Sequence, residues 1–198
     1  MNIVFDIGNV LVAWDPRAAF RDAFDNDTEI DCFLADVGFF EWNLEQDRGR
    51  RRAEAVAAIA GDWPAQAALL DGFFDRFHLT IQHKIAGTWA IMERLRARGF
   101  RIFGLTNWGP DTWPVALEMH PQLGEAFEDV VVSGHEGLIP QREIFELLCR
   151  RNLLSPSDCF FVDDSKKNAD GARAAGWQAH HFVGPGGLRQ DLTERGLL

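Results

Sequence analysis

NIVFDIGNVL, residues 2–11, is the stretch that decides the fold of this chain. Residues 2–5 predict a short buried strand that ends at an acid and a glycine, Asp6 and Gly8. Asp6 interrupts the apolar run, and no basic segment precedes it, so we expect neither a signal peptide nor a transmembrane helix. The stretch instead predicts a strand that brings a carboxylate to one edge of a sheet.

Further strand-like runs follow in the second half of the chain, and helical patterns separate them. The expected strands lie at 101–105, 129–133, 159–163 and 178–183, and the expected helices at 87–98, 142–152 and 167–175. Strands that alternate with helices imply right-handed crossovers and a parallel sheet covered on both faces. The predicted fold class is therefore α/β, with a three-layer, Rossmann-like parallel sheet.

Residues 15–82 have a different pattern. Apolar residues recur there at helical spacing, as in Leu69, Phe73 and Phe77, and no strand-like run appears. We interpret this region as an insert of about four helices after the first strand. The expected domains are an α/β core, residues 1–14 and 83–198, and a small helical domain, residues 15–82.

The charge of the chain narrows the choice of partner. Thirty acidic residues against 20 Lys and Arg give a net charge of -10, which argues against nucleic acid or an anionic membrane. A phosphorylated small molecule is compatible, because a bound cation can invert the local field. The three cysteines are scattered and form no disulfide framework, which favours the cytoplasm.

Polar residues directly follow three of the predicted strands. Asp6 follows the first, Thr106 and Asn107 the second, and Asp163 and Asp164 end the fourth. In open parallel sheets, ligands bind at the carboxyl ends of the strands, so these side chains should meet at one edge. Carboxylates brought together repel one another unless a cation or a proton lies between them, and oxygen-only ligands favour magnesium over zinc.

Three motifs in this chain resemble those of the haloacid dehalogenase superfamily. FDIGNVL at 5–11, GLTNW at 104–108 and FVDDSKKNADGARAAGW at 161–177 are similar to its first, second and fourth motifs. Each follows a predicted strand, and together they span nearly the whole chain. The helical insert falls where this superfamily places its cap. The first motif also resembles that of a branch containing sugar-phosphate phosphatases.

The resemblance implies a magnesium site and a nucleophile. By similarity, Asp6 is both the nucleophile and a metal ligand, and the backbone carbonyl of Gly8 is a second ligand. Asp164 would complete the protein's share of the metal site, with Asp163 supporting it.

The resemblance also gives roles to neighbouring polar residues. Thr106 would donate a hydrogen bond to a phosphoryl oxygen, and Asn107 and Asn168 would lie close by. Trp108, next to Asn107, is the best candidate for a tryptophan in the substrate pocket. Two other tryptophans are expected in the core, Trp42 and Trp63.

This chain departs from the superfamily pattern in its first motif. Phosphatases of the superfamily usually carry a second aspartate, a general acid and base, two residues after the nucleophile. Here that position is Gly8, followed by Asn9. General acid–base catalysis raises the rate of such reactions by about 10²–10⁴-fold, so its loss should slow turnover without abolishing it.

A second departure concerns the third motif, which normally supplies a lysine that neutralises the nucleophile and the phosphoryl group. GLIPQREIF, residues 137–145, aligns with it only if that lysine is deleted. Arg142 is the nearest replacement, or else an ordinary solvated residue in the first turn of a helix. Lys166 and Lys167 of the fourth motif are further candidates.

The leading functional prediction is a magnesium-dependent phosphatase that acts through an aspartyl-phosphate on a small phosphorylated metabolite. One alternative is a 2-haloacid dehalogenase, in which Asp6 attacks carbon. Such enzymes carry an arginine in an early cap motif, and here Arg17 and Arg21 precede the expected position. The other alternative is a catalytically impaired binding protein. The sequence names neither the substrate nor the oligomeric state.

Overall fold

A computed structural model describes residues 1–61, 63–138 and 142–198. Its centre is a parallel sheet of five strands in the order β3-β2-β1-β4-β5. The strands are β1 (Asn2–Phe5), β2 (Arg101–Thr106), β3 (Val130–Val132), β4 (Cys159–Asp163) and β5 (Gln178–His181). β1 lies between β2 and β4, with Phe5 opposite Gly104 on one side and Val162 on the other. This register brings Asp6, Thr106 and Asp163 to the same edge of the sheet.

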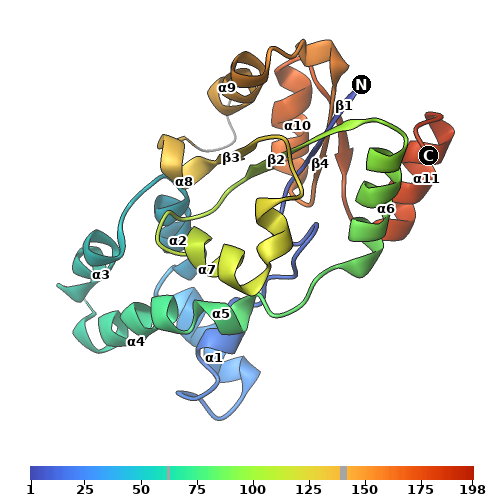
Figure 1. The fold of residues 1–198 in the computed structure, drawn as a ribbon. Coiled ribbons are helices and arrows are strands. Elements are labelled where there is room, and N and C mark those ends of the chain that lie inside the picture. The colour runs from blue at the N-terminus through green and yellow to red at the C-terminus, as the bar shows by residue number, and fades with distance from the viewer. Residues whose placement is uncertain (62, 139–141) are drawn as a thin grey trace.

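Helices cover both faces of the sheet (Figure 1). Side chains alternate along β1, so that Ile3 and Phe5 pack on one face and Val4 on the other. The first face is covered by α6 (Ala86–Ala97) and α11 (Pro185–Glu194), and the second by α9 (Arg142–Asn152) and α10 (Lys166–Ala174). The predicted three-layer α/β fold is therefore confirmed.

Short elements complete the core. α7 (Trp113–Met119) follows β2, and α8 (Ser133–Glu136) follows β3. Two 3₁₀ helices lie in the connections, η2 (Pro121–Gly124) and η3 (Pro156–Asp158). Neither α7 nor α11 was predicted from the sequence. Pro114 follows the first residue of α7, and Pro185 begins α11, the positions at which a helix tolerates proline.

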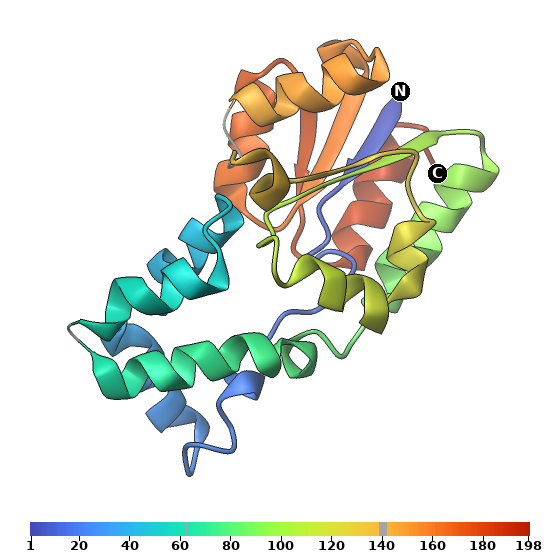
Figure 2. The ribbon, with the colours of Figure 1, turned by 60° about the vertical axis from the view of Figure 1, so that its left-hand side comes forward.

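The helical region lies beyond one edge of the sheet (Figure 2). It consists of η1 (Pro16–Ala19), α1 (Asp27–Asp36), α2 (Phe39–Asp47), α3 (Arg52–Ala60), α4 (Pro64–Asp75) and α5 (Phe77–Thr80). Aromatic rings hold these helices together, with Phe39 and Phe73 in edge-to-face contact at a centroid distance of 5.2 Å. Trp42 is buried in this cluster, as predicted.

The prediction for Trp63 is wrong, because 43% of this residue is exposed. It is the N-cap residue of α4, directly before Pro64.

Two adjacent connections join the helical region to the core. The backbone N–H of Ala13 donates to His83, and that of Asp15 donates to Thr80, each at 2.8 Å. The last residue of α2 is also tied to the sheet, because the Ser133 hydroxyl donates to the Asp47 carbonyl at 2.6 Å. These contacts hold the C-terminal end of α2 close to the carboxyl edge of the sheet.

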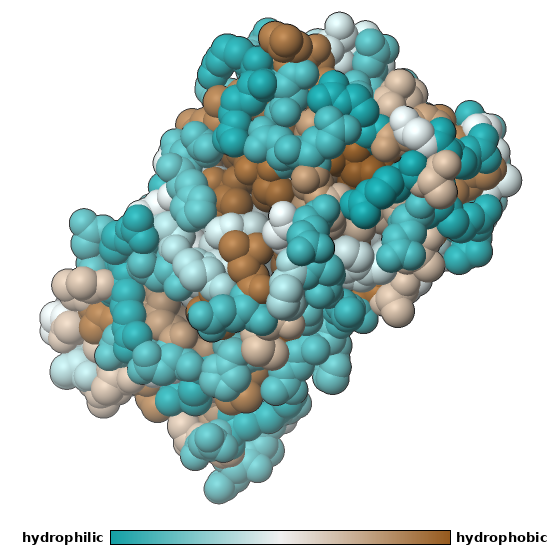
Figure 3. Space-filling view, viewed as in Figure 1, coloured by the Kyte–Doolittle hydropathy of each residue, from teal (hydrophilic) through white to brown (hydrophobic). Residues whose placement is uncertain are grey.

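The surface is mainly hydrophilic on the face shown in Figure 3. The larger exposed apolar side chains include Phe40, Leu153 and Val183, which lie far apart in the sequence. In the part of the chain that the structure describes, no helix has the length and apolar character needed to cross a bilayer.

Candidate active site

Three carboxylates meet at the carboxyl edge of the sheet. Asp6 follows β1, Asp163 ends β4, and Asp164 comes next in the chain. Each offers one oxygen, and these oxygens all lie within 4.8 Å of one another. The backbone N–H of Asp6 donates to Val162 at 2.9 Å, which extends the pairing of β1 with β4 and holds the carboxylates side by side.

These three residues, Asp6, Asp163 and Asp164, form what we call the acid cluster. Their carboxylates repel one another, and burial makes the charged forms less favourable. Only 8% of Asp6 and 2% of Asp163 is exposed. Burial, followed by repulsion from Asp163 and Asp164, raises the pKa of Asp6 well above its usual range. Burial also raises the pKa of Asp163 and of Asp164. A hard divalent cation fits these residues, because it would relieve the repulsion and accept oxygen ligands only.

Replacing Asp6 with asparagine is expected to stabilise the protein when divalent cations are removed. A carboxyl with a raised pKa binds its proton more tightly in the folded than in the unfolded protein, so it lowers the stability once the pH exceeds its unfolded value of about 4. At pH 7.5 in a chelator, Asp6→Asn should raise the thermal midpoint by at least about 2–4 °C, the shift for roughly 1 kcal/mol in a chain of this length.

At about pH 3, below the pKa of this carboxyl in the folded and in the unfolded protein, the two proteins should unfold at similar temperatures, because the carboxyl is then mostly protonated in both states. The control is Asp22→Asn, which removes one exposed negative charge. A midpoint for Asp6→Asn at or below that of the unchanged protein at pH 7.5 would contradict repulsion within the acid cluster.

Asp163 is held by neighbours rather than directed toward open space. One of its oxygens accepts from the Ser165 backbone N–H at 2.7 Å. The Asn168 side-chain amide donates to both oxygens, at 3.2 and 3.1 Å. Ser165 is the N-cap of α10, so the start of this helix fixes both donors. The structure thus places Asn168 beside the acid cluster, in contact with Asp163.

Two polar side chains at the end of β2 lack a hydrogen bond of good geometry in the described chain. Thr106 is 1% exposed, and its hydroxyl lies close enough to the Asp6 carboxyl to lower the pKa of that group, without a well-formed hydrogen bond. The side-chain oxygen of the next residue, Asn107, is also buried and unpaired. Buried polar groups are nearly always hydrogen-bonded, so these two atoms fit a bound ligand or ordered water at this edge.

The turn after Asp6 has an unusual backbone. Asn9 adopts a left-handed conformation with φ of 53°, which asparagine tolerates better than most residues. Its side-chain oxygen accepts from the backbone N–H of Trp14 at 3.0 Å, so this turn positions Trp14. Sequence reasoning gave Asn9 no role, although an asparagine after a glycine is a turn signal.

The acid cluster opens into a cavity, which we call the acid cavity. It is lined by Asp6, Gly8, Asn9, Trp14, Leu44, Asp47, Asn107, Asp164, Ser165, Lys167 and Asn168. A second cavity, the aromatic cavity, is lined by Gly8, Trp14, Asn43, Asp47, Phe77, Asn107, Trp108, Gly109 and Thr112. The two share four lining residues and therefore adjoin. Sequence reasoning missed Trp14, which the turn at Asn9 positions. It also missed Asn43, Leu44 and Asp47, which reach the site only when α2 packs against the core.

Arg142, the nearest replacement for the third-motif lysine, lies at the surface of the protein. Arg142 begins α9, 76% of its side chain is exposed, and its Nε donates to Glu146 at 2.6 Å. It lines neither cavity, and residues 139–141 lie outside the described residues. Lys167 is instead the cation that lines the acid cavity within the described chain. Lys166 pairs with Asp170 at 2.6 Å.

Comparisons with known proteins agree with this geometry. A relative named D-ribitol-5-phosphate phosphatase, from Bacteroides thetaiotaomicron, is 26% identical over 97% of this chain and 96% of its own length. A haloacid dehalogenase family enzyme from the same organism, solved with magnesium and inorganic phosphate, superposes with a TM-score of 0.71 at 19% identity, covering 90% of this chain and 92% of that one.

L-2-haloacid dehalogenase from Xanthobacter autotrophicus, with chloropropionic acid covalently bound, shares the fold at a TM-score of 0.65 and 15% identity, over 100% of this chain and 84% of that one. The family model for haloacid dehalogenase-like hydrolases matches residues 1–176. With its acid cluster at the carboxyl edge of a Rossmann-like sheet, this chain is a hydrolase that belongs to the haloacid dehalogenase-like family.

Proposed function

We propose that this protein is a magnesium-dependent phosphatase that hydrolyses a small phosphorylated metabolite through an aspartyl-phosphate on Asp6. The observation that carries the proposal is the buried acid cluster with the buried Thr106 hydroxyl beside Asp6. A phosphoryl group bound there would accept a hydrogen bond from Thr106, and a cation would neutralise the carboxylates. The phosphatase named above, similar along nearly its full length, supports the same activity.

Magnesium would be held by Asp6, the Gly8 carbonyl and Asp164, and when bound it supplies positive charge to the phosphoryl oxygens. The Asp6 carboxylate attacks phosphorus in line with the departing oxygen. Thr106 donates to an equatorial oxygen, and Asn107 orients the phosphoryl group. Lys167 supplies the positive charge that the third motif lacks, and Asp163 with Asn168 keeps the acidic edge in place.

The leaving group would occupy the aromatic cavity. Trp14 and Trp108 line this cavity, and the indole N–H groups of both are buried without an acceptor in the described chain. Hydroxyl oxygens would satisfy them, so a small polyhydroxyl leaving group suits this cavity better than an apolar one. We infer that residues 15–82 form a cap that excludes water from the core domain, 1–14 and 83–198. The three cysteines are free thiols, which supports a reducing, cytoplasmic location.

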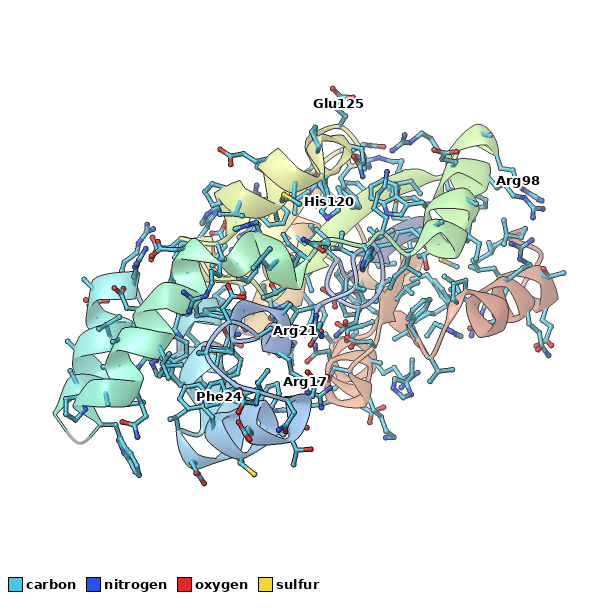
Figure 4. The ribbon with its side chains drawn as sticks, turned by 90° about the horizontal axis from the view of Figure 1, so that it is seen from below. Arg17, Arg21, Phe24, Arg98, His120 and Glu125 are labelled. Carbon is cyan, nitrogen blue, oxygen red and sulfur yellow. The ribbon has the colours of Figure 1, made fainter. Side chains whose placement is uncertain are left out.

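A haloacid dehalogenase activity has less support from the side chains. Haloacid dehalogenases of this superfamily carry an arginine in an early cap motif, and no arginine lines either cavity among the described residues. Arg17 donates to Asp31 at 2.5 and 2.9 Å, and Arg21 donates to Asp15 at 2.8 Å. Figure 4 shows both arginines with Phe24 where the cap begins. These two arginines are therefore occupied by ion pairs within the cap.

The test is phosphate release from a panel of small phosphomonoesters, including linear polyol phosphates, with magnesium and with a chelator. We expect release that requires magnesium. Halide release from 2-chloropropionate without magnesium would favour the dehalogenase. Magnesium binding by a folded protein that releases neither product would overturn the enzymatic proposal and favour a binding protein.

A further inference from the structure

The phosphatase reaction needs a proton donor that the first motif does not supply. The oxygen that leaves phosphorus must gain a proton unless it is stable as an anion, and positioned acids contribute about 10²–10⁴-fold to such steps. Gly8 stands where an aspartate usually serves this purpose. A Cβ built at Gly8 would meet no atom within 4 Å, so the space beside it is open.

That open space lies where the two cavities adjoin. Their shared lining residues are Gly8, Trp14, Asp47 and Asn107. With the phosphoryl group in the acid cavity and the leaving group in the aromatic cavity, the oxygen between them lies at this junction. Asp47 is the carboxyl-bearing residue that lines both cavities within the described chain.

Asp47 is held in place by the core. It ends α2, and its backbone carbonyl accepts from the Ser133 hydroxyl at 2.6 Å. The Ser133 oxygen in turn accepts from the backbone N–H of Trp108 at 3.1 Å. This short network joins the cap helix to the loop that follows β2. Because that loop also carries Asn107, the position of Asp47 is tied to the phosphoryl site.

The carboxyl group of Asp47 is available for chemistry. The one hydrogen bond to its side chain among the described residues is a long one from the Asn43 amide, at 3.4 Å, and no ion pair in this part of the chain includes it. Burial raises its pKa to about 7, so a large fraction carries a proton near neutral pH. The charged residues that line the same cavities are Asp6, Asp164 and Lys167.

We propose that Asp47, on the cap, is the general acid and base of the phosphatase reaction proposed above. As the bond from phosphorus to the leaving oxygen breaks and the bond to Asp6 forms, Asp47 gives its proton to the leaving oxygen, which departs as an alcohol. Asp47, now a carboxylate, takes a proton from the water that attacks phosphorus. That second step releases phosphate and restores both carboxyl groups.

The test compares leaving groups in the full-length protein. Asp47→Asn should lower kcat/KM for an alkyl phosphate by about 10²-fold. For p-nitrophenyl phosphate, whose leaving group departs as a stable anion, the loss should be no more than about 5-fold. Glu41→Gln, an exposed acid on the same helix, is the matched control and should leave both values unchanged. Equal losses for both substrates, or no loss, would overturn the assignment.

A second variant provides a rescue. Because the space beside Gly8 is open, adding Gly8→Asp to the Asp47→Asn variant should raise its kcat/KM for the alkyl phosphate at least about tenfold. A folded double variant that binds magnesium and recovers nothing would contradict a proton-transfer role. If the unchanged protein released no phosphate from either ester, the phosphatase proposal itself would fail, which is a separate outcome.

Discussion

Asp6→Asn should lower magnesium-dependent phosphate release by roughly 10⁴-fold or more, the largest effect expected in this protein. An amide nitrogen or oxygen of asparagine is a poor nucleophile toward phosphorus, so the covalent step is lost. Asparagine has nearly the same shape as aspartate, so the acid cavity keeps its size. The measurement is the initial rate of phosphate release at saturating magnesium, with Asp22→Asn as the control for the lost charge.

The stability of the same variant makes this result interpretable. Asp6 is buried among like charges, and its replacement is expected to raise the thermal midpoint of the metal-free protein. A variant that is more stable and yet inactive has lost chemistry rather than structure. Release above about 1% of the normal rate would show that Asp6 is not the nucleophile, since a lost nucleophile costs far more than 100-fold.

The sheet and its acidic edge could be predicted because the signals are local. The strands β1, β2 and β4 are short, mainly apolar runs, and an acid or hydroxyl ends or directly follows each of them. Parallel pairing then requires Asp6, Thr106 and Asp163 to meet, whatever lies between them in the sequence. The family resemblance added roles for these residues, and those roles remain proposals.

The other side of the site could not be predicted, because it forms between distant segments. Asp47 lies 41 residues after Asp6 on a helix whose sequence, FFEWNLEQD, has no catalytic signature. Its place depends on Ser133, 86 residues further along. Arg142, considered because it lies beside the third motif, pairs with Glu146 at the surface in the structure, and its role in the site stays a prediction. Proximity in sequence is enough to place the ends of paired strands, but it does not fix where a charged side chain on a helix points.

Asp164→Asn should raise the magnesium concentration needed for half-maximal activity at least about 10–100-fold. Asp164 is half-buried, and one of its oxygens lies within 4.8 Å of oxygens from Asp6 and Asp163. Neutralising it removes one of the few charges available to a cation at this edge. The measurement is a magnesium titration of phosphate release, together with direct magnesium binding by calorimetry.

Asp163 and Asp170 provide the comparison that gives this result its meaning. Asp163 already accepts hydrogen bonds from Ser165 and Asn168, so Asp163→Asn should affect the magnesium requirement less than Asp164→Asn does. Asp170→Asn removes an exposed charge from α10, where Asp170 pairs with Lys166 and Arg173, and should leave the requirement unchanged. If Asp163→Asn had the larger effect, the two neighbouring acids would exchange roles. Excess magnesium should partly restore Asp164→Asn, because a weakened site can still be filled, whereas no magnesium concentration can restore a missing nucleophile.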